Sequence, residues 1–276
     1  MSAAETVTPG ADRREVPELR VESVSLTFGG IRALDDVSFT VAPGTVHALI
    51  GPNGAGKSSC FNVISGLYPP TSGRVLLGGT VLTGTGPHRL AGLGVGRSFQ
   101  NLALSAGSTV LDNIMVGRHA LTRGGFFAGG LRWPPTTRSE RRHTDRATEI
   151  AAFLGIGHVL EQPVGSLPYG LAKRVDVARA LATEPTVLLL DEPAAGLDAV
   201  ETARMAATIG DLGRELGISV LLVEHDMGLV MGIADRVSVL DFGRLIADGP
   251  PADVRDDPEV VRAYLGTEEN GQEGAS

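Results

Sequence analysis

The chain has 276 residues, of which 42% are hydrophobic, and a formal net charge of −8. This length allows one large domain or two lobes with a substantial core. The acidic balance argues against a nucleic-acid partner, which needs clustered positive charge. No apolar run reaches the ~20 residues of a membrane-spanning helix, and the single cysteine, Cys60, excludes an internal disulfide and fits a reducing cytosol.

Both ends of the chain are polar. Residues 1–18 contain two prolines and no pattern of a secretory signal. Residues 267–276 are rich in Glu and Gly. We expect two disordered tails, 1–18 and 267–276, on either side of an ordered domain that spans 19–266.

Three short segments rich in β-forming residues are separated by Gly and Pro turns: Leu19–Leu26, Val37–Val41 and Arg74–Leu77. They predict a mostly antiparallel lobe. Three nearly continuous apolar runs predict parallel strands buried on both faces: Val46–Ile50, Val187–Leu190 and Ser219–Val223. Helical patterns such as Val200–Leu216 separate these runs. This alternation predicts an α/β sheet with its ligand site at the carboxyl ends of the strands.

A phosphate-binding loop of the form G-x-x-x-x-G-K-[ST] follows the first of these strands and opens a helix expected over Lys57–Ser65. It reads Gly51-Pro52-Asn53-Gly54-Ala55-Gly56-Lys57-Ser58, and Ser59 adjoins it. Its glycines let backbone N–H groups converge on a phosphate, and the helix dipole favours the anion. We expect this whole stretch to bind a nucleotide, with Lys57 at the β- and γ-phosphates and the Ser58 hydroxyl on Mg²⁺.

The middle of the chain, about 102–182, lacks strand signals. It carries three helical stretches, and we interpret it as a helical lobe inserted into the sheet domain: Val110–Val116, Ser139–Leu154 and Leu171–Leu181. Within it, Gly124–Pro135 is rich in Gly, Pro and aromatic residues and is expected to be an ordered loop. Near the end of the chain, Pro258–Leu265 should form a helix that Asp257 caps and Gly266 ends.

Side chains that suit nucleotide chemistry follow the buried strands. Asp191 can hold Mg²⁺, and the adjacent Glu192 can orient or deprotonate a water. His225 ends the next apolar run, where it can donate a hydrogen bond to a phosphate or to the attacking water. Gln100 lies where the sheet passes into the helical lobe, and its amide oxygen can touch Mg²⁺ or water.

Two further features have more than one interpretation. Phe28 either stacks on the nucleotide base or packs in the core. The turn before Leu171, Ser166–Gly170, is either a second anion site at a helix N-terminus or a simple helix start.

In this order along the chain, these motifs resemble the ATP-binding subunits of ABC transporters, over about Leu19 to Leu265. Finer segments resemble the high-affinity branched-chain amino acid importers, although importers of urea and short amides look similar. These segments are 26–34, 97–101, 126–133, 191–197, 224–227 and 262–266.

The resemblance implies a P-loop NTPase fold with a mixed RecA-like core sheet, an antiparallel β subdomain and an inserted helical subdomain. It also implies an ATPase that uses ATP and Mg²⁺, with Glu192, His225 and Gln100 as catalytic residues. Ser58, Gln100 and Asp191 would be the metal ligands, and Asp198 the residue of the family's D-loop.

The same resemblance implies partners. Two such subunits sandwich two ATP molecules, each between one chain's phosphate loop and the other chain's signature turn. The helical lobe near Gln100 would receive a cytoplasmic helix of an integral membrane permease. The chain would thus be attached to the cytoplasmic face of the membrane through that permease, and indirectly to a periplasmic or lipoprotein solute receptor.

One motif departs from the family pattern. Where the family has Leu-Ser-Gly-Gly-Gln, this chain has Leu167-Pro168-Tyr169-Gly170-Leu171. Pro168 offers neither a hydroxyl nor a backbone N–H, and Leu171 cannot hydrogen-bond as glutamine does. The nucleotide site that uses this signature should therefore turn over more slowly than the opposite one.

Two alternatives are weighed against amino-acid import. A motor for lipid or lipopolysaccharide extraction fits less well with the segment around 126–133 and with the ending Ala263–Gly266. A soluble nucleic-acid-associated ATPase would carry two cassettes or a long coiled-coil insertion, whereas this chain has a single cassette and is acidic.

Overall fold

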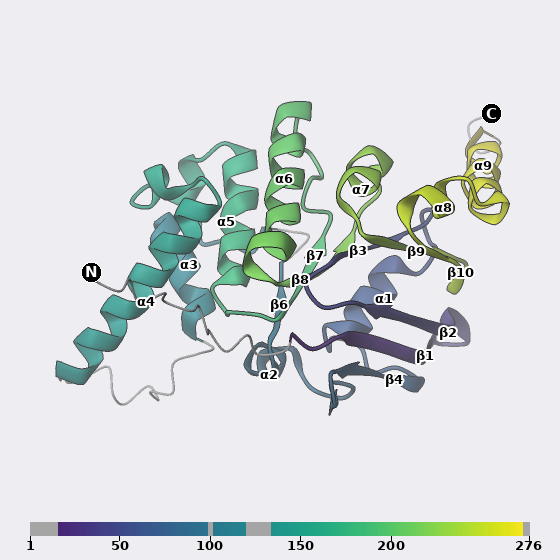
Figure 1. The fold of residues 1–276 in the computed structure, drawn as a ribbon, viewed down its shortest axis with the longest axis horizontal. Coiled ribbons are helices and arrows are strands. Elements are labelled where there is room, and N and C mark those ends of the chain that lie inside the picture. Colours follow the sequence, from purple (N-terminus) through teal and green to yellow (C-terminus); the bar gives the residue numbers. More distant parts are fainter. Residues whose placement is uncertain (1–15, 99–101, 120–133, 273–276) are drawn as a thin grey trace, which may run out of the picture.

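The fold is described from a computed structural model, which defines residues 16–98, 102–119 and 134–272. Figure 1 shows two parts side by side, one built on β-sheets and one made of helices. Within the described residues, no helix is both long enough and apolar enough to cross a membrane.

A mixed six-stranded sheet forms the centre of the larger part, in the order β10-β9-β3-β8-β7-β6. Its strands are β3 Val46–Ile50, β6 Val95–Arg97, β7 Val187–Asp191, β8 Ser219–Val223, β9 Arg236–Asp241 and β10 Arg244–Gly249. All neighbours pair in parallel except β10, which is antiparallel to β9. Every residue of β3, β7 and β8 is buried, as apolar runs covered on both faces require.

A second, antiparallel sheet has the strand order β2-β1-β4-β5. Its strands are β1 Leu19–Phe28, β2 Ile31–Val41, β4 Ser72–Leu77 and β5 Thr80–Val81. Helix α1, Lys57–Ile64, shares one apolar cluster with this sheet and with one face of the six-stranded sheet. The fully buried Phe61 lies in that cluster and fixes α1, together with the loop before it, against both sheets.

The helical part contains α3 (Val110–Arg118), α4 (Pro134–Phe153) and α5 (Tyr169–Leu181), which pack on one another. Helix α3 begins with a capping box, in which the Thr109 hydroxyl accepts from the backbone of Asp112 and the Asp112 carboxylate accepts from Thr109. An apolar cluster joins these helices to α6, Ala199–Leu216, and to the core sheet. The fold class predicted from the sequence is confirmed: an α/β core sheet, an antiparallel sheet and a group of helices inserted between β6 and β7.

Several elements were not predicted. Besides β6, β9, β10 and β5, they are α2 Pro87–Leu90, α7 Met227–Ile233, α8 Pro251–Arg255 and the short 3-10 helices η1 Ala91–Leu93, η3 Gly157–Val159 and η4 Val164–Ser166. Each is short, and β9 and β10 mix polar and apolar residues, so none produces a long periodic pattern.

Both expected tails need correction at their inner ends. Residues 16–18 belong to the fold, since the carbonyl of Glu18 accepts a hydrogen bond from Gly78 N–H at 2.8 Å. Helix α9 spans Pro258–Gln272 and passes through Gly266, where we expected it to end. A glycine inside a helix costs only about 1 kcal/mol relative to alanine, and the glutamates that follow it favour helix. Residues 1–15, Gln100 and 124–133 lie outside the described residues.

Candidate active site

The predicted site residues gather at one edge of the core sheet because β3, β8 and β7 are neighbours. The phosphate loop follows β3, Glu192 follows β7 and His225 lies just beyond β8. A cleft of about 480 Å³ opens at this edge. It is lined by residues 53–59 of the loop, by Glu192, by Ile31–Ala33 at the start of β2 and by Phe242–Gly243 between β9 and β10.

The phosphate loop is shaped by contacts that exclude side chains. Gly51 and Gly56 have φ angles of 147° and 102°. A Cβ on Gly51 would lie 2.1 Å from the carbonyl oxygen of Leu240, and one on Gly56 would lie 2.7 Å from that of Ala33. Both positions therefore require glycine.

Helix α1 begins without a side-chain cap and without an acidic residue in its first turn. Its first N–H groups have no partner inside the helix, and the residues that carry them line the cleft. A phosphate group fits this donor set, since it would supply the acceptors and the negative charge that a helix N-terminus favours.

Lys57 is a buried cation that has no ionic partner at hydrogen-bond distance among the described residues. It is 9% exposed, and its Nζ donates to the carbonyl oxygens of Gly51 at 2.6 Å and Pro52 at 2.9 Å. Burial lowers the pKa of Lys57, and the carboxylate of Glu192 acts in the opposite direction. An anion in the cleft would stabilise this ammonium group more than the two neutral carbonyls do.

The two carboxylates after β7 occupy different environments. Asp191 is 6% exposed, and burial raises its pKa while the guanidinium of Arg97 opposes that shift. Glu192 lines the cleft with its side chain 28% exposed. The Ser58 hydroxyl at the start of α1 and the Asp191 carboxylate are hard oxygen donors at the same edge of the sheet, which suits Mg²⁺ together with phosphate oxygens.

The backbone of Glu192 is in the left-handed region, with φ of 47°. For a residue with a side chain, this conformation costs about 1–2 kcal/mol. Three hydrogen bonds hold it: Glu192 N–H donates to Val223 O at 2.9 Å, and its carbonyl accepts from Lys173 Nζ at 3.0 Å and from Ala195 N–H at 3.2 Å. Lys173 belongs to α5 and is 4% exposed, so it ties the helical part to this backbone. We did not predict this role from the sequence.

His225 lies between two carboxylates. Its Nδ1 is 3.9 Å from Glu192 Oε1 and 3.6 Å from Glu224 Oε2, and its imidazole is 61% exposed. The exposed ring can therefore reach a ligand in the cleft, with both carboxylates near its Nδ1.

Glu224 is a buried acid that the sequence reasoning missed. Its carboxylate accepts from the backbone N–H of Ala194 at 3.0 Å, of His225 at 3.0 Å and of Asp226 at 3.5 Å. One side chain thus links the loop after β7 to the loop after β8. An ionisable residue directly after a fully buried strand was the signal that could have revealed it.

Two other predicted residues, Phe28 and Asp198, are not part of the cleft lining. Phe28 is 45% exposed, and its ring packs edge-to-face on Tyr68 at 5.2 Å. Asp198 caps α6, accepting from Glu201 N–H at 2.8 Å. Gln100 is outside the described residues.

The signature stretch 167–171 lies at the start of α5, with Pro168 as the residue before the first turn and no side-chain cap. None of its five residues lines the cleft. The carboxylate of Glu201 covers Gly170, because a Cβ there would be 2.2 Å from Glu201 Oε1. In this conformation a carboxylate from the same chain already occupies the anion-favouring end of α5.

The comparisons with known families match two regions. The ABC transporter family model matches residues 34–195. The model of the branched-chain amino acid ATP-binding cassette transporter matches residues 244–270.

Characterised proteins align along most of the chain. It is 40% identical to the high-affinity branched-chain amino acid transport ATP-binding protein BraF of Pseudomonas aeruginosa, covering 91% of this chain and 98% of BraF. It is 39% identical to LivG of Escherichia coli over the same shares.

Solved structures of ABC transporter cassettes are also similar to this chain. The ADP conformation of MJ1267, an ATP-binding cassette of an ABC transporter, is 33% identical with a TM-score of 0.79, covering 91% of this chain and 99% of that one. The dimeric cassette MJ0796 is 25% identical with a TM-score of 0.71, covering 84% and 98%.

Replacing Glu224 with glutamine should destabilise the protein. In the natural chain, backbone N–H groups donate to the Glu224 carboxylate. In the variant, the amide NH₂ faces one of these donors, so a charge-assisted hydrogen bond is lost at a cost of about 1.5–3 kcal/mol. The free energy of unfolding in urea would measure the loss. Glu215→Gln, an exposed acid on α6, is the control and should change it by less than about 0.5 kcal/mol. Equal stability of the two variants would show that the three contacts of Glu224 contribute little.

Proposed function

This chain belongs to the ATP-binding cassettes of ABC transporters, in the branched-chain amino acid group, and we propose that it hydrolyses ATP to drive import of branched-chain amino acids or similar small solutes. One observation carries the proposal: the complete phosphate loop opens on the same cleft as Glu192, with His225 3.9 Å from that carboxylate. The match over residues 244–270 favours amino-acid import over lipid transport or a nucleic-acid-associated ATPase.

The residues of the cleft divide the chemistry among them. The amides of the loop bind the β- and γ-phosphates, and Lys57 leaves the carbonyls of Gly51 and Pro52 to pair with them. Glu192 orients the attacking water and accepts its proton, and His225 donates to the γ-phosphate. Ser58 and Asp191, with Gln100, would hold Mg²⁺, which when bound neutralises charge on the phosphates.

The proposed site needs a second cassette. The signature stretch 167–171 does not line its own chain's cleft, so in our proposal it binds the nucleotide held by a partner. The dimeric form of the related cassette MJ0796 supports this arrangement. When the two cassettes close, the incoming phosphate would compete with the Glu201 carboxylate, because both are anions that favour the start of α5. Glu201 would then have to leave this position for the phosphate to bind there.

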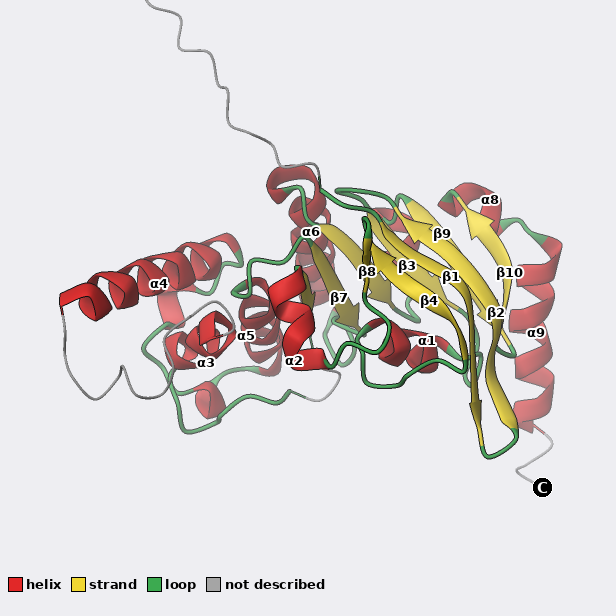
Figure 2. Ribbon diagram, turned by 90° about the horizontal axis from the view of Figure 1, so that it is seen from below, coloured by secondary structure: helices red, strands yellow, loops and turns green. Residues whose placement is uncertain are grey.

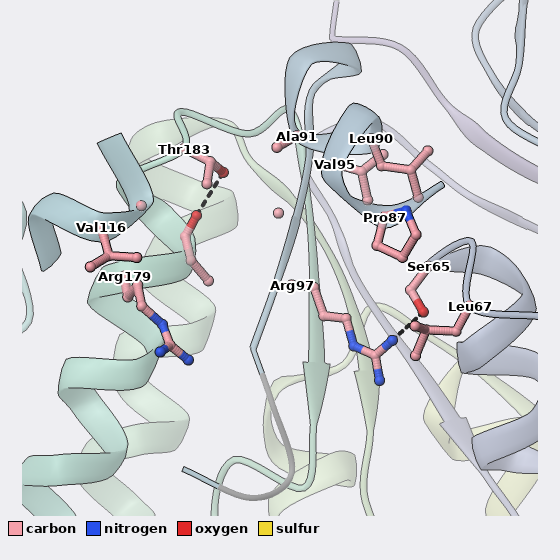
Figure 3. A pocket seen from close by; sticks show the side chains of 13 residues that line it. Ser65, Leu67, Pro87, Leu90, Ala91, Val95, Arg97, Val116, Arg179 and Thr183 are labelled. Carbon is pink, nitrogen blue, oxygen red and sulfur yellow. Dashed lines mark hydrogen bonds between the residues drawn. The ribbon is translucent and has the colours of Figure 1, made fainter. Parts of the chain in front are cut away.

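A groove between the two parts of the fold is our candidate for the permease contact (Figure 3). Its volume is about 270 Å³. Leu67, Pro87 and Leu90 line one side, whereas Val116 and Arg179 from the helical part line the other. Strand β6 also lines it, through Val95, Gly96 and Arg97. A helix of an integral membrane permease inserted here would touch both parts at once and attach the chain to the cytoplasmic face of the membrane.

Lys57→Ala should weaken ATP binding about 100-fold or more while the chain stays folded. The variant lacks the buried cation that faces the phosphates, and loss of such a partner costs about 2–5 kcal/mol. Calorimetric titration with Mg-ATP measures the affinity, and circular dichroism checks the fold. Retained affinity would mean that this loop is not the phosphate site.

The two nucleotide sites of a heterodimer should be unequal. The site on this chain's loop uses the partner's signature, whereas the partner's site uses the altered Pro168 and Leu171. We expect Glu192→Gln to remove most of the ATPase activity of the assembled transporter, and the equivalent change in the partner to remove less. Steady-state ATPase assays on the two single variants make the comparison. Equal losses would refute the asymmetry.

Val116→Asp should separate the cassette from its permease. Val116 is 55% exposed in the groove, and a carboxylate there would lose its hydration once an apolar helix face docks on it. Copurification from detergent-solubilised membranes should fall at least tenfold, while ATP affinity stays within twofold. Val81→Asp, at an exposed valine on β5, is the matched control and should copurify normally. Equal recovery of both variants would exclude the groove as the permease contact.

A further inference from the structure

Lys173 contacts both the signature stretch and the backbone of Glu192. Helix α5, which carries it, packs beside β7 (Figure 2). Its Nζ donates to the carbonyl of Glu192 at 3.0 Å, and it lies 5.6 Å from the centroid of the Tyr169 ring, one helical turn earlier on α5. At such a distance an ammonium group is attracted to the face of an aromatic ring.

The ring of Tyr169 packs on the loop that follows β7. A Cβ on Gly196 would be 3.1 Å from Tyr169 Cε1, so the ring lies directly against the Gly196 backbone. Within the same loop, Ala195 N–H closes a turn on the Glu192 carbonyl at 3.2 Å. Lys173 therefore holds the loop where it begins, and Tyr169 holds it near its end.

The two side chains differ in burial. Lys173 is 4% exposed, whereas Tyr169 is 49% exposed and does not line its own chain's cleft. A buried ammonium group has few acceptable positions, because its charge and its donors must be satisfied in each of them. An exposed ring can be displaced by a ligand or by a second chain. Displacement of Tyr169 therefore changes the surroundings of Lys173, which holds the left-handed backbone of Glu192.

We propose that Lys173 is a positioning residue that couples the two nucleotide sites of a cassette pair. It holds Glu192, in this chain's own cleft, at a place that depends on Tyr169, in the stretch that faces the partner's nucleotide. The inference rests on the proposed function, since it requires a second cassette. A nucleotide bound against the signature stretch would thus set the position of the carboxylate in the opposite site, where a small misplacement slows the reaction.

The test measures one nucleotide site while the other is altered. The partner cassette carries glutamine in place of its catalytic glutamate, so ATP turnover by the assembled transporter comes from the site on this chain's loop. Tyr169 is not part of that site. Tyr169→Ala should nevertheless lower kcat there about 3-fold to 10-fold, with the KM for ATP within about twofold. Leu216→Ala, at a residue of similar exposure at the far end of α6, is the control and should leave kcat unchanged.

A double-variant comparison assigns the effect to Lys173. Lys173→Met removes the charge and the donor at a similar side-chain length, and it should lower kcat about tenfold. In that chain Tyr169→Ala should add less than about 1.5-fold, because the connection is already broken. Lys173→Arg keeps a charge and a donor and should preserve the response to Tyr169→Ala.

Two results would overturn the proposal. One is an unchanged kcat in the Tyr169→Ala chain. The other is an equal effect of Tyr169→Ala in the natural and the Lys173→Met chains, since the ring would then act by another route, such as the pairing of the two cassettes.

Folding and the proposed function are checked separately. Thermal stabilisation by Mg-ATP should give the isolated Lys173→Met chain an ATP affinity within about threefold of the natural one, because its phosphate loop is unaltered. Lys173→Gln, which keeps a polar group in the buried position, replaces it if it does not fold. If the natural assembly shows no ATPase activity that depends on Lys57, the proposed function fails, and not merely the coupling.

Discussion

Close contact between backbone segments is the constraint on which this site depends. The phosphate loop, the start of β2 and the β9–β10 turn approach so closely that a Cβ on Gly51, Gly56 or Gly243 would overlap a carbonyl oxygen. The loop is consequently positioned by main-chain contacts on several sides rather than by its own flexible residues. Fully buried strands below it and Phe61 in α1 hold those segments in register.

Buried charge connects the parts that surround the cleft. Glu224 accepts hydrogen bonds from the loops after β7 and β8, so Ala194 and His225 cannot shift independently. Lys173 reaches from α5 to the carbonyl of Glu192 and ties the signature helix to the strained backbone there. A movement of the helical part can therefore change the place of Glu192 without any movement of β7 itself.

Much of this arrangement follows from the sequence, because its strongest signals are local. The phosphate loop, the strands β3 and β8 and the helix α6 are specified by nearby residues. What the sequence did not reveal depends on contacts between distant segments. The ring of Phe28 meets Tyr68, Glu224 reaches Ala194, and Phe242 lies beside the loop only because β9 and β10 pair next to β3. The helix α9 continued past Gly266 because one glycine is a weak stop signal.

Lys57 and Lys173 are the only lysines in the sequence, since every other strongly basic side chain is an arginine. Both are buried, and both donate to carbonyl groups within the site. Their side-chain amines are thus shielded from acylating reagents as long as the cleft and the α5 contact stay intact. Chemical acylation of these two amines, followed by mass spectrometry, would register each opening of the two regions separately, without a fluorophore or an engineered residue.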